Sequence, residues 1–217
     1  MTFRKPVQIV PAWNQHPPIK MLQSSKFKLI VGLGNPGKEY ANTYHNVGYL
    51  TLDHIGRWLR ITGKWDRPSG KKFTYLKDGE LIMVKPLTFM NESGAAVRQA
   101  LAYFKCELQE ILIIHDDSDI ALGKYKLVSG RGPAGHRGIL SIIAALGTKN
   151  FARLRLGIRH TIKAGLPAGA RQSSPPLGLR RAKAGDFVLR KIRPEDKRVL
   201  YSTIEGLTPK VIVNDTS

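Results

Sequence analysis

The chain has 217 residues, enough for one ordinary domain with a sizeable core. Hydrophobic residues make up 42% of it and charged residues 24%, which are globular values, and no apolar run approaches the roughly 20 residues that a membrane-spanning helix requires. The 35 Lys and Arg against 16 Asp and Glu give a net charge of +19, which favours a polyanionic partner such as nucleic acid, although a generally basic surface gives the same count. The single cysteine, Cys106, excludes an internal disulfide and a metal site built from cysteines.

The first 25 residues differ from the rest in composition. They contain no Asp or Glu and include Pro6, Pro11, Pro17 and Pro18, so we expect residues 1–25 to form a flexible basic lead outside the domain. A lead without acids is typical of organelle transit peptides, but this one has few Arg and Ser and too many prolines for a good amphipathic helix. Translation could also begin at Met21, and both interpretations stay open.

Apolar patterns divide the rest of the chain into strands and helices. In chain order they predict a strand at 27–31, a helix around 47–59, strands at 73–76 and 81–84, a helix opening at 91–93, strands at 111–114 and 125–128, a helix at 139–146, a strand at 154–158 and a last helix within 186–207. The Asp78-Gly79 dipeptide between two strands indicates an antiparallel hairpin. Asn46 is placed to cap the first helix.

Strands that alternate with helices, with one hairpin inserted, predict the α/β class. We expect a single three-layer domain over residues 26–207, with a mixed, largely parallel central sheet flanked by helices. Within it, residues 163–183 change to Ala, Gly, Pro, Ser and Arg, which is typical of a mobile basic loop. Residues 208–217 are expected to form a frayed tail.

Polar residues follow the predicted parallel strands where a ligand crevice is expected. In open α/β sheets that crevice lies beyond the carboxyl ends of the strands. Asn35 and His45 follow the first strand, Asn91 follows the third, and Asp116 comes where the apolar run 111–114 stops. A carboxylate that orients an imidazole lets the other ring nitrogen take a proton from water, and asparagine amides can stabilise an oxyanion. Each residue alone also has a plainer explanation, as a surface histidine, a helix cap or a loop residue.

A competing pattern is the dinucleotide-binding fingerprint. Gly32, Gly34 and Gly37 follow the first strand with the spacing G-x-G-x-x-G. In that fold the third glycine lies within a helix, whereas here helical periodicity begins only near Val47. The acid expected at the end of the second strand is also missing, because Asp53 falls inside the predicted helix. A nucleotide-binding enzyme is therefore disfavoured.

Short motifs in a fixed order carry a resemblance to a known family. They are GLGNPGKEY at 32–40, TYHNVG at 43–48, KPLTFMNESG at 85–94, HDDSD at 115–119, GHRG at 135–138 and LRLGI at 154–158. Together, from about residue 27 to about residue 189, they resemble the bacterial-type peptidyl-tRNA hydrolase family.

The resemblance implies an activity and roles for particular residues. It implies a monomeric α/β hydrolase that needs no metal or cofactor, cleaves the ester between peptide and tRNA, and recycles tRNA from prematurely released peptides, in the cytoplasm or in a mitochondrial or plastid matrix. His45 would be the catalytic base, Asp116 would keep it basic, and Asn35 would help distinguish blocked peptidyl-tRNA from free aminoacyl-tRNA. Contacts with the substrate end of the tRNA are expected from Tyr40, Phe89 and Asn91.

The chain departs from the family pattern in places. The family usually has Asn where this chain has Arg137, a cation that can bind tRNA phosphate but cannot accept a hydrogen bond. Residues 163–183 are longer and more basic than in the family, and the C-terminal helix is shorter. The excess positive charge and Arg137 slightly favour an alternative, a non-catalytic RNA-binding relative that assists splicing or associates with ribosomes. The presence of His45 and Asp116 together with both asparagines favours catalysis, since a pure binder has no need of a base and its orienting acid.

Overall fold

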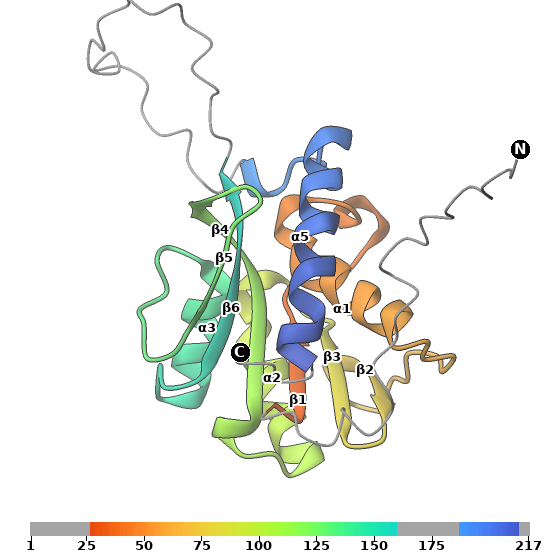
Figure 1. The fold of residues 1–217 in the computed structure, drawn as a ribbon. Helices are drawn as coiled ribbons and strands as arrows, with labels where there is room; N and C mark the ends of the chain where they lie inside the picture. Colours follow the sequence, from red (N-terminus) through yellow and green to blue (C-terminus); the bar gives the residue numbers. More distant parts are fainter. Residues whose placement is uncertain (1–26, 160–186, 213–217) are drawn as a thin grey trace, which may run out of the picture.

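The computed structural model describes residues 27–159 and 187–212. Within these ranges, helices cover both faces of one six-stranded sheet (Figure 1). The expected flexible lead (1–25) and basic loop (163–183) lie outside the described residues, as do the last five residues of the expected tail (213–217). In the part of the chain that the structure describes, no helix is both long and apolar enough to cross a membrane.

The sheet is mixed and largely parallel, as predicted. Its strands are β1 (Leu29–Gly32), β2 (Phe73–Asp78), β3 (Leu81–Pro86), β4 (Ile111–Ala121), β5 (Tyr125–Val128) and β6 (Ala152–Arg159). They lie in the order β2-β3-β1-β4-β6-β5, in which β3, β1, β4 and β6 run parallel. The edge strands β2 and β5 pair antiparallel with β3 and β6, and the β2–β3 pair is the predicted hairpin. The α/β class and the mixed sheet are therefore confirmed.

The helices form the outer two layers because the strands bury apolar side chains on both faces. The main helices are α1 (Val47–Trp58), α2 (Ser93–Phe104), α3 (Arg137–Leu146) and α5 (Pro194–Ile212). Successive residues of a strand point to opposite faces, so Leu112 packs in the cluster with α1 and α5, whereas Ile111 and Ile113 pack in the cluster with α2 and α3. An apolar run without alternation thus fills two cores at once.

The last helix begins later and ends later than the expected range of 186–207. Pro194 is its first residue, where the fixed φ of proline suits a helix start and its missing N–H costs no hydrogen bond. Glu195 and Asp196 follow in the first turn, where their negative charges interact favourably with the helix dipole. Residues 208–212 continue this helix.

Strand β4 is longer than its apolar run, so the expectation that it stops before His115 is wrong. His115, Asp116 and Asp117 pair with residues 155–157 of β6, and the ladder resumes at Ala121 after a register shift. Backbone pairing continues here while the side chains change from apolar to polar, because this end of the strand borders a cavity. Asp116 is therefore held by a strand and not by a loop.

Two glycines allow α1 to lie directly against the end of β1. A Cβ on Gly48 would come 2.4 Å from the backbone nitrogen of Leu33 and 2.5 Å from the backbone oxygen of Ile114. Both contacts are with backbone atoms, so a change of side-chain rotamer cannot relieve them. A Cβ on Gly32 would lie 2.3 Å from the oxygen of Gly48. A Cβ on Gly34 would lie 2.7 Å from the ring of Tyr49 on the same helix, so the G-x-G spacing at the end of β1 is explained by close packing of helix on strand.

Replacing Gly48 with alanine should destabilise the protein by about 2 to 3 kcal/mol, because backbone on both sides must move. Thermal denaturation measures the effect as a lower Tm. Gly206→Ala in α5 is the matched control: nothing lies within 4 Å of its Cβ position, and alanine favours a helix over glycine by roughly 0.5 to 1 kcal/mol, so its Tm should stay level or rise. Equal Tm values for the two variants would contradict the packing argument.

Candidate active site

A cavity of about 570 Å³ opens at the carboxyl ends of the parallel strands. Its walls come from the segments after β1 and β3, the polar end of β4 and the start of α3. The residues singled out from the sequence that line it are Asn35, Tyr40, His45, Phe89, Asn91, Asp116 and Arg137. The structure thus brings together side chains that lie far apart in the chain.

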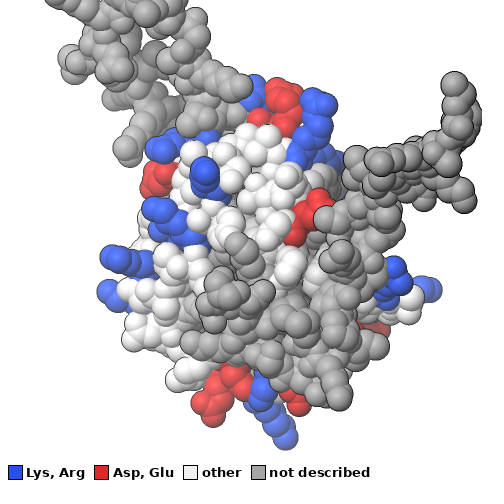
Figure 2. All heavy atoms as spheres, in the orientation of Figure 1, with Lys and Arg blue, Asp and Glu red and all other residues white. Residues whose placement is uncertain are grey.

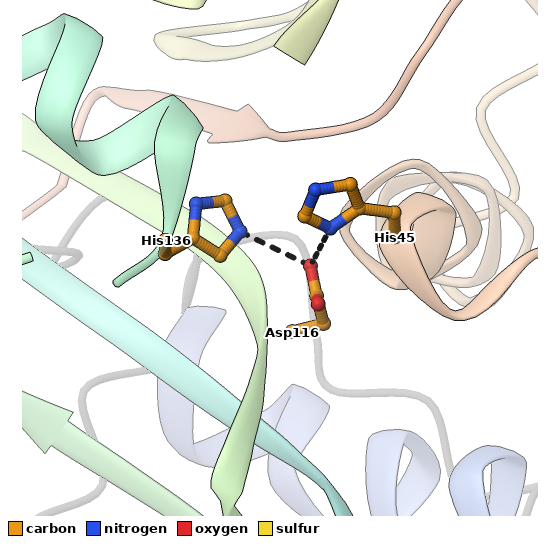
Figure 3. Close-up of side chains that lie close together, drawn as sticks. All are labelled: His45, Asp116 and His136. Atoms are coloured by element: carbon orange, nitrogen blue, oxygen red, sulfur yellow. Dashed lines mark hydrogen bonds and ion pairs between the residues drawn. The ribbon is translucent and has the colours of Figure 1, made fainter. Parts of the chain in front are cut away.

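His45 and Asp116 meet directly in this cavity. His45 sits on a short 3-10 turn, Tyr44–Asn46, immediately before α1. Its Nδ1 lies 2.8 Å from Oδ1 of Asp116, and both residues are buried (Figure 3). An ionised carboxylate can only accept hydrogen bonds, so Nδ1 of His45 carries the proton and donates it. Nε2, which points away from Asp116 in Figure 3, is left with a free lone pair.

A second histidine, His136, contacts the same carboxylate oxygen. Its Nε2 lies 3.1 Å from Oδ1 of Asp116 (Figure 3). Its Nδ1 accepts hydrogen bonds from the backbone N–H groups of Gly138, at 3.1 Å, and Ile139, at 3.3 Å, so His136 is the N-cap of α3. Sequence reasoning missed this residue, which stood in the GHRG motif without a role. The available signal was a polar residue between a glycine-rich stretch and an apolar helix, where a cap is expected.

The charges in this cluster shift the pKa values of both partners. Burial alone would raise the pKa of Asp116, but the two histidines and the hydrogen bonds they donate hold it well below its ordinary range. Burial alone would lower the pKa of His45, but the charge and hydrogen bond of Asp116 outweigh it and raise that pKa. The nearby Arg137 guanidinium opposes this rise. Asp116 is therefore ionised at neutral pH, and His45 is a stronger base than a free imidazole.

His115 lies beneath this cluster and is fully buried. Its Nδ1 donates to the backbone oxygen of Asp116 at 2.7 Å, and its ring meets that of His136 edge to face at 4.6 Å. Burial, followed by the proximity of His136, lowers the pKa of His115 well below its ordinary value. A neutral ring held in the core supports the cluster and is not available for proton transfer.

Asn35 is held by a reciprocal pair of hydrogen bonds to Asn46. The side-chain oxygen of Asn46 accepts from the backbone N–H of Asn35, and its amide nitrogen donates to the backbone oxygen of Asn35, both at 2.9 Å. The expectation that the Asn46 side chain caps α1 is therefore wrong, because no cap hydrogen bond forms. The side-chain oxygen of Asn35 accepts from the N–H of Met90 at 2.7 Å. The NH₂ group of Asn35 thus remains for a ligand in the cavity.

The outer part of the cavity is aromatic and basic. Phe89 is 53% exposed and meets the ring of Tyr40 edge to face at 6.1 Å. Asn91 and Arg137 are exposed side chains of the same cavity, and Arg137 has no acidic partner among residues 27–159 and 187–212. The other acid of the cavity floor, Asp117, pairs with Arg155 at 2.6 Å. The unpaired charge at the mouth is therefore positive.

His45, Asp116 and His136 also have the composition of a metal site. Ligand atoms of His45, Asp116 and His136 all lie within 4.8 Å of one another. Both imidazole nitrogens, however, already donate to the single oxygen Oδ1, so the direct hydrogen bonds account for the arrangement. An ion would have to replace both of these protons.

The dinucleotide interpretation fails on backbone geometry. Gly37 has a φ of 110° and leads into a three-residue 3-10 turn, Lys38–Tyr40, and not into an α-helix. The first α-helix of the described residues begins only at Val47, and backbone of β1 packs against its start, so this helix N-terminus is not open to a phosphate.

Comparisons with known proteins agree with one another. Residues 29–213 match the family model described as "Peptidyl-tRNA hydrolase". The chain is similar to the peptidyl-tRNA hydrolase of Aquifex aeolicus, at 37% identity over 179 residues that cover 82% of this chain and 84% of the relative, and to that of Lacticaseibacillus casei, at 42% identity over 134 residues, 61% and 72% of the two chains. A crystal structure of peptidyl-tRNA hydrolase from Acinetobacter baumannii superposes with a TM-score of 0.70 at 28% identity, covering 88% of this chain and 90% of that one.

Proposed function

The chain belongs to the peptidyl-tRNA hydrolase family, and on this premise we propose that it hydrolyses the ester joining a peptide to the 3′ end of tRNA, with His45 as general base and Asp116 as the residue that orients it. The observation that carries the proposal is the 2.8 Å hydrogen bond between Nδ1 of His45 and Oδ1 of Asp116. It fixes the tautomer in which Nε2 is free to take a proton at the cavity wall.

The reaction follows from this geometry. Nε2 of His45 removes a proton from water as the water oxygen bonds to the ester carbonyl carbon. The imidazolium that forms is stabilised by the carboxylate of Asp116, whose lowered pKa keeps it charged. When the tetrahedral intermediate collapses, the bond from carbon to the ribose oxygen breaks and the proton on His45 passes to that oxygen. The products are a free peptide and a tRNA with its 3′ hydroxyl restored.

Neutral amides suit the charge that develops on the substrate. The side-chain oxygen of Asn35 already accepts from Met90, so its NH₂ group is the part that faces a ligand. This NH₂ group donates to the peptide carbonyl that is attached to the α-nitrogen of the esterified residue. A free aminoacyl group has no such carbonyl, so Asn35 distinguishes the two substrates. Asn91 donates to the developing oxyanion or to a ribose hydroxyl. Phe89 and Tyr40 offer an exposed aromatic surface on which a terminal base can stack.

Positive charge on the surface suits the phosphates of tRNA. Figure 2 shows Lys and Arg side chains down the left-hand side of the molecule, where Figure 1 places β5 and β6. The exposed cations of these strands and their flanking loops, within the described residues, are Lys124, Lys126, Arg131, Lys149 and Arg159. Together with Arg137 they favour a nucleic-acid partner over a small substrate.

Purified protein should release N-acetyl-amino acid from N-acetyl-aminoacyl-tRNA and leave unblocked aminoacyl-tRNA nearly intact. Acid-precipitable radiolabel measures both reactions side by side. The alternative, a non-catalytic RNA-binding relative, predicts binding of both tRNAs and hydrolysis of neither, so an absence of release with intact binding would favour it.

The affinity for tRNA should fall steeply with salt, because each phosphate contact releases counterions. Arg137→Asn should reduce the slope of log affinity against log salt by about 1 if Arg137 contacts one phosphate. Removing its cation should also raise the pKa of His45 and move the acid limb of activity to higher pH. Arg98→Asn, at an exposed position on α2, is the control and should change neither. A flat salt response would contradict a phosphate-dominated interface.

We also propose that the protein acts as a monomer, because one chain supplies the base, its orienting acid and both amides. The place of action is the compartment where peptidyl-tRNA arises, which is the cytoplasm or an organelle matrix. Light scattering at assay concentration measures the oligomeric state, and a dimer at that concentration would contradict the proposal that the protein acts as a monomer.

A further inference from the structure

One carboxylate oxygen accepts hydrogen bonds from two imidazoles, and only one of them, that of His45, has a role in the proposed reaction. Oδ1 of Asp116 accepts from Nδ1 of His45 at 2.8 Å and from Nε2 of His136 at 3.1 Å (Figure 3). The side chain of His136 is 8% exposed and that of Asp116 is 2% exposed, so little water competes for this bond. The rings of His45 and His136 lie 5.0 Å apart and do not bond to each other.

The tautomer of His136 is set by α3. The N–H groups of Gly138 and Ile139 can only donate, so Nδ1 of His136 must present its lone pair to them. In a neutral ring the proton then resides on Nε2, which is the nitrogen that faces Asp116. The backbone at the start of α3 therefore decides that His136 is a donor to the carboxylate.

We propose that His136 is a positioning residue for the hydrolysis, holding the Asp116 carboxylate by a hydrogen bond whose direction is imposed by the first turn of α3. This inference rests on the proposed function, in which Asp116 orients His45. A carboxylate held only by His45 could rotate about its χ2 or turn toward water, and the base would then lose its fixed orientation. With His136 in place, the start of α3, the end of β4 and the turn before α1 are linked through one oxygen atom.

The charged groups around His45 determine the direction of the expected pH effect. Those that face it are Asp116 on β4, and His136 and Arg137 at the start of α3, while Asp117 is paired with Arg155. The bond from His136 draws negative charge from Asp116. Its removal leaves a stronger anion beside His45, so the pKa of His45 rises and activity requires a higher pH.

Two substitutions separate the hydrogen bond from His136 to Asp116 from the two capping bonds that His136 accepts at the start of α3. The amide of glutamine extends to the position of Nε2 and can still donate to Asp116, but it is poorly placed to accept from Gly138 and Ile139. The amide of asparagine ends at the position of Nδ1, so it keeps the cap, for which asparagine is a preferred residue, and falls short of Asp116. Each variant is thus the control for the other.

The expected result is that His136→Gln keeps a kcat and pH profile close to those of the unchanged protein, with a lower Tm from the lost cap. His136→Asn should keep its Tm and KM but lose about tenfold in kcat, because a hydrogen bond to a charged group is missing, and its acid limb should move to higher pH. A purely structural role as a helix cap predicts the opposite pattern, with activity kept by asparagine and lost with glutamine. That pattern, or an equal loss of kcat in both variants, would overturn the proposal.

A titration of His45 by NMR separates this proposal from the proposed function, because it requires no turnover. The His45 midpoint should rise in His136→Asn and stay in place in His136→Gln, and two-bond ¹H–¹⁵N spectra should show the proton of His136 on Nε2. Unchanged midpoints in both variants would refute the role of His136 even in an active enzyme. Full activity in a His45→Ala variant would instead refute the proposed function.

Discussion

Replacing His45 with alanine should abolish release of N-acetyl-amino acid from tRNA while leaving the affinity for tRNA nearly intact. The loss should be about 10² to 10⁴-fold in kcat, the usual contribution of a general base. Binding should persist because the contacts proposed for phosphate and base lie on other elements, among them α3 and the segment after β3. Single-turnover hydrolysis and a filter-binding titration measure the two quantities separately.

The matched control is His54→Ala. His54 is a partly buried histidine on α1 that does not line the cavity, and burial lowers its pKa. Its loss should leave kcat close to that of the unchanged protein. If His45→Ala lost binding and hydrolysis in equal measure, His45 would be a structural histidine and the general-base mechanism would be wrong.

The second large effect is expected from Asp116→Asn, which should lower kcat by about 10³ to 10⁴-fold, in line with the corresponding change in a serine protease triad. An asparagine in this place can turn its NH₂ group to Nδ1 of His45. The ring would then have to accept at Nδ1 and carry its proton on Nε2, where the base is needed. The shape of the site is preserved and its chemistry is lost. Steady-state kinetics on N-acetyl-aminoacyl-tRNA measures the change.

The pH dependence of Asp116→Asn has a definite sign. In the unchanged protein Asp116 raises the pKa of His45, so activity rises with pH through a midpoint above the ordinary imidazole value. Without the carboxylate that pKa falls, and the residual activity should have its acid limb at lower pH. Asp119→Asn, at an exposed position later on β4, is the control and should leave the profile in place. An acid limb that did not move in Asp116→Asn would contradict coupling between the two residues.

The same carboxylate should make the stability of the protein depend on pH. Its pKa is lowered in the folded protein, so the stabilisation is present above the ordinary carboxyl pKa and is lost as pH falls through the folded value. His45 acts in the opposite sense: its raised pKa favours folding below the ordinary imidazole pKa, and this contribution is lost as pH rises through the folded value.

Most of the fold could be predicted from local patterns, because short apolar runs and turn residues act within a few positions of one another. The Asp78-Gly79 turn located the β2–β3 hairpin, and the uninterrupted run 111–114 indicated a strand buried on both faces. The same reasoning placed the end of β4 too early. Strand pairing with β6 continues through polar residues, and a pattern of hydrophobicity cannot detect backbone hydrogen bonds to a distant partner.

The residue types of the candidate site were also visible in the sequence, since a base, an acid and two amides are recognisable by their chemistry at the predicted rim. The role of His136 was not, because it depends on a contact with Asp116, which lies 20 residues earlier, and only its place as a helix cap has a local signal. The role of Asn46 was misjudged for a similar reason, as its side chain turns to Asn35 and away from the helix it precedes.

The amino-acid sequence by itself determined the α/β class, the order of the elements and the chemical groups available for hydrolysis, because these depend on composition and on spacing along the chain. Tertiary structure alone decided which nitrogen of His45 carries a proton. The carboxylate of Asp116, which lies 71 residues away, accepts a hydrogen bond from Nδ1, so the proton is on Nδ1 and the lone pair is on Nε2. The base at the cavity wall therefore exists only when β4, α3 and the turn before α1 are packed together.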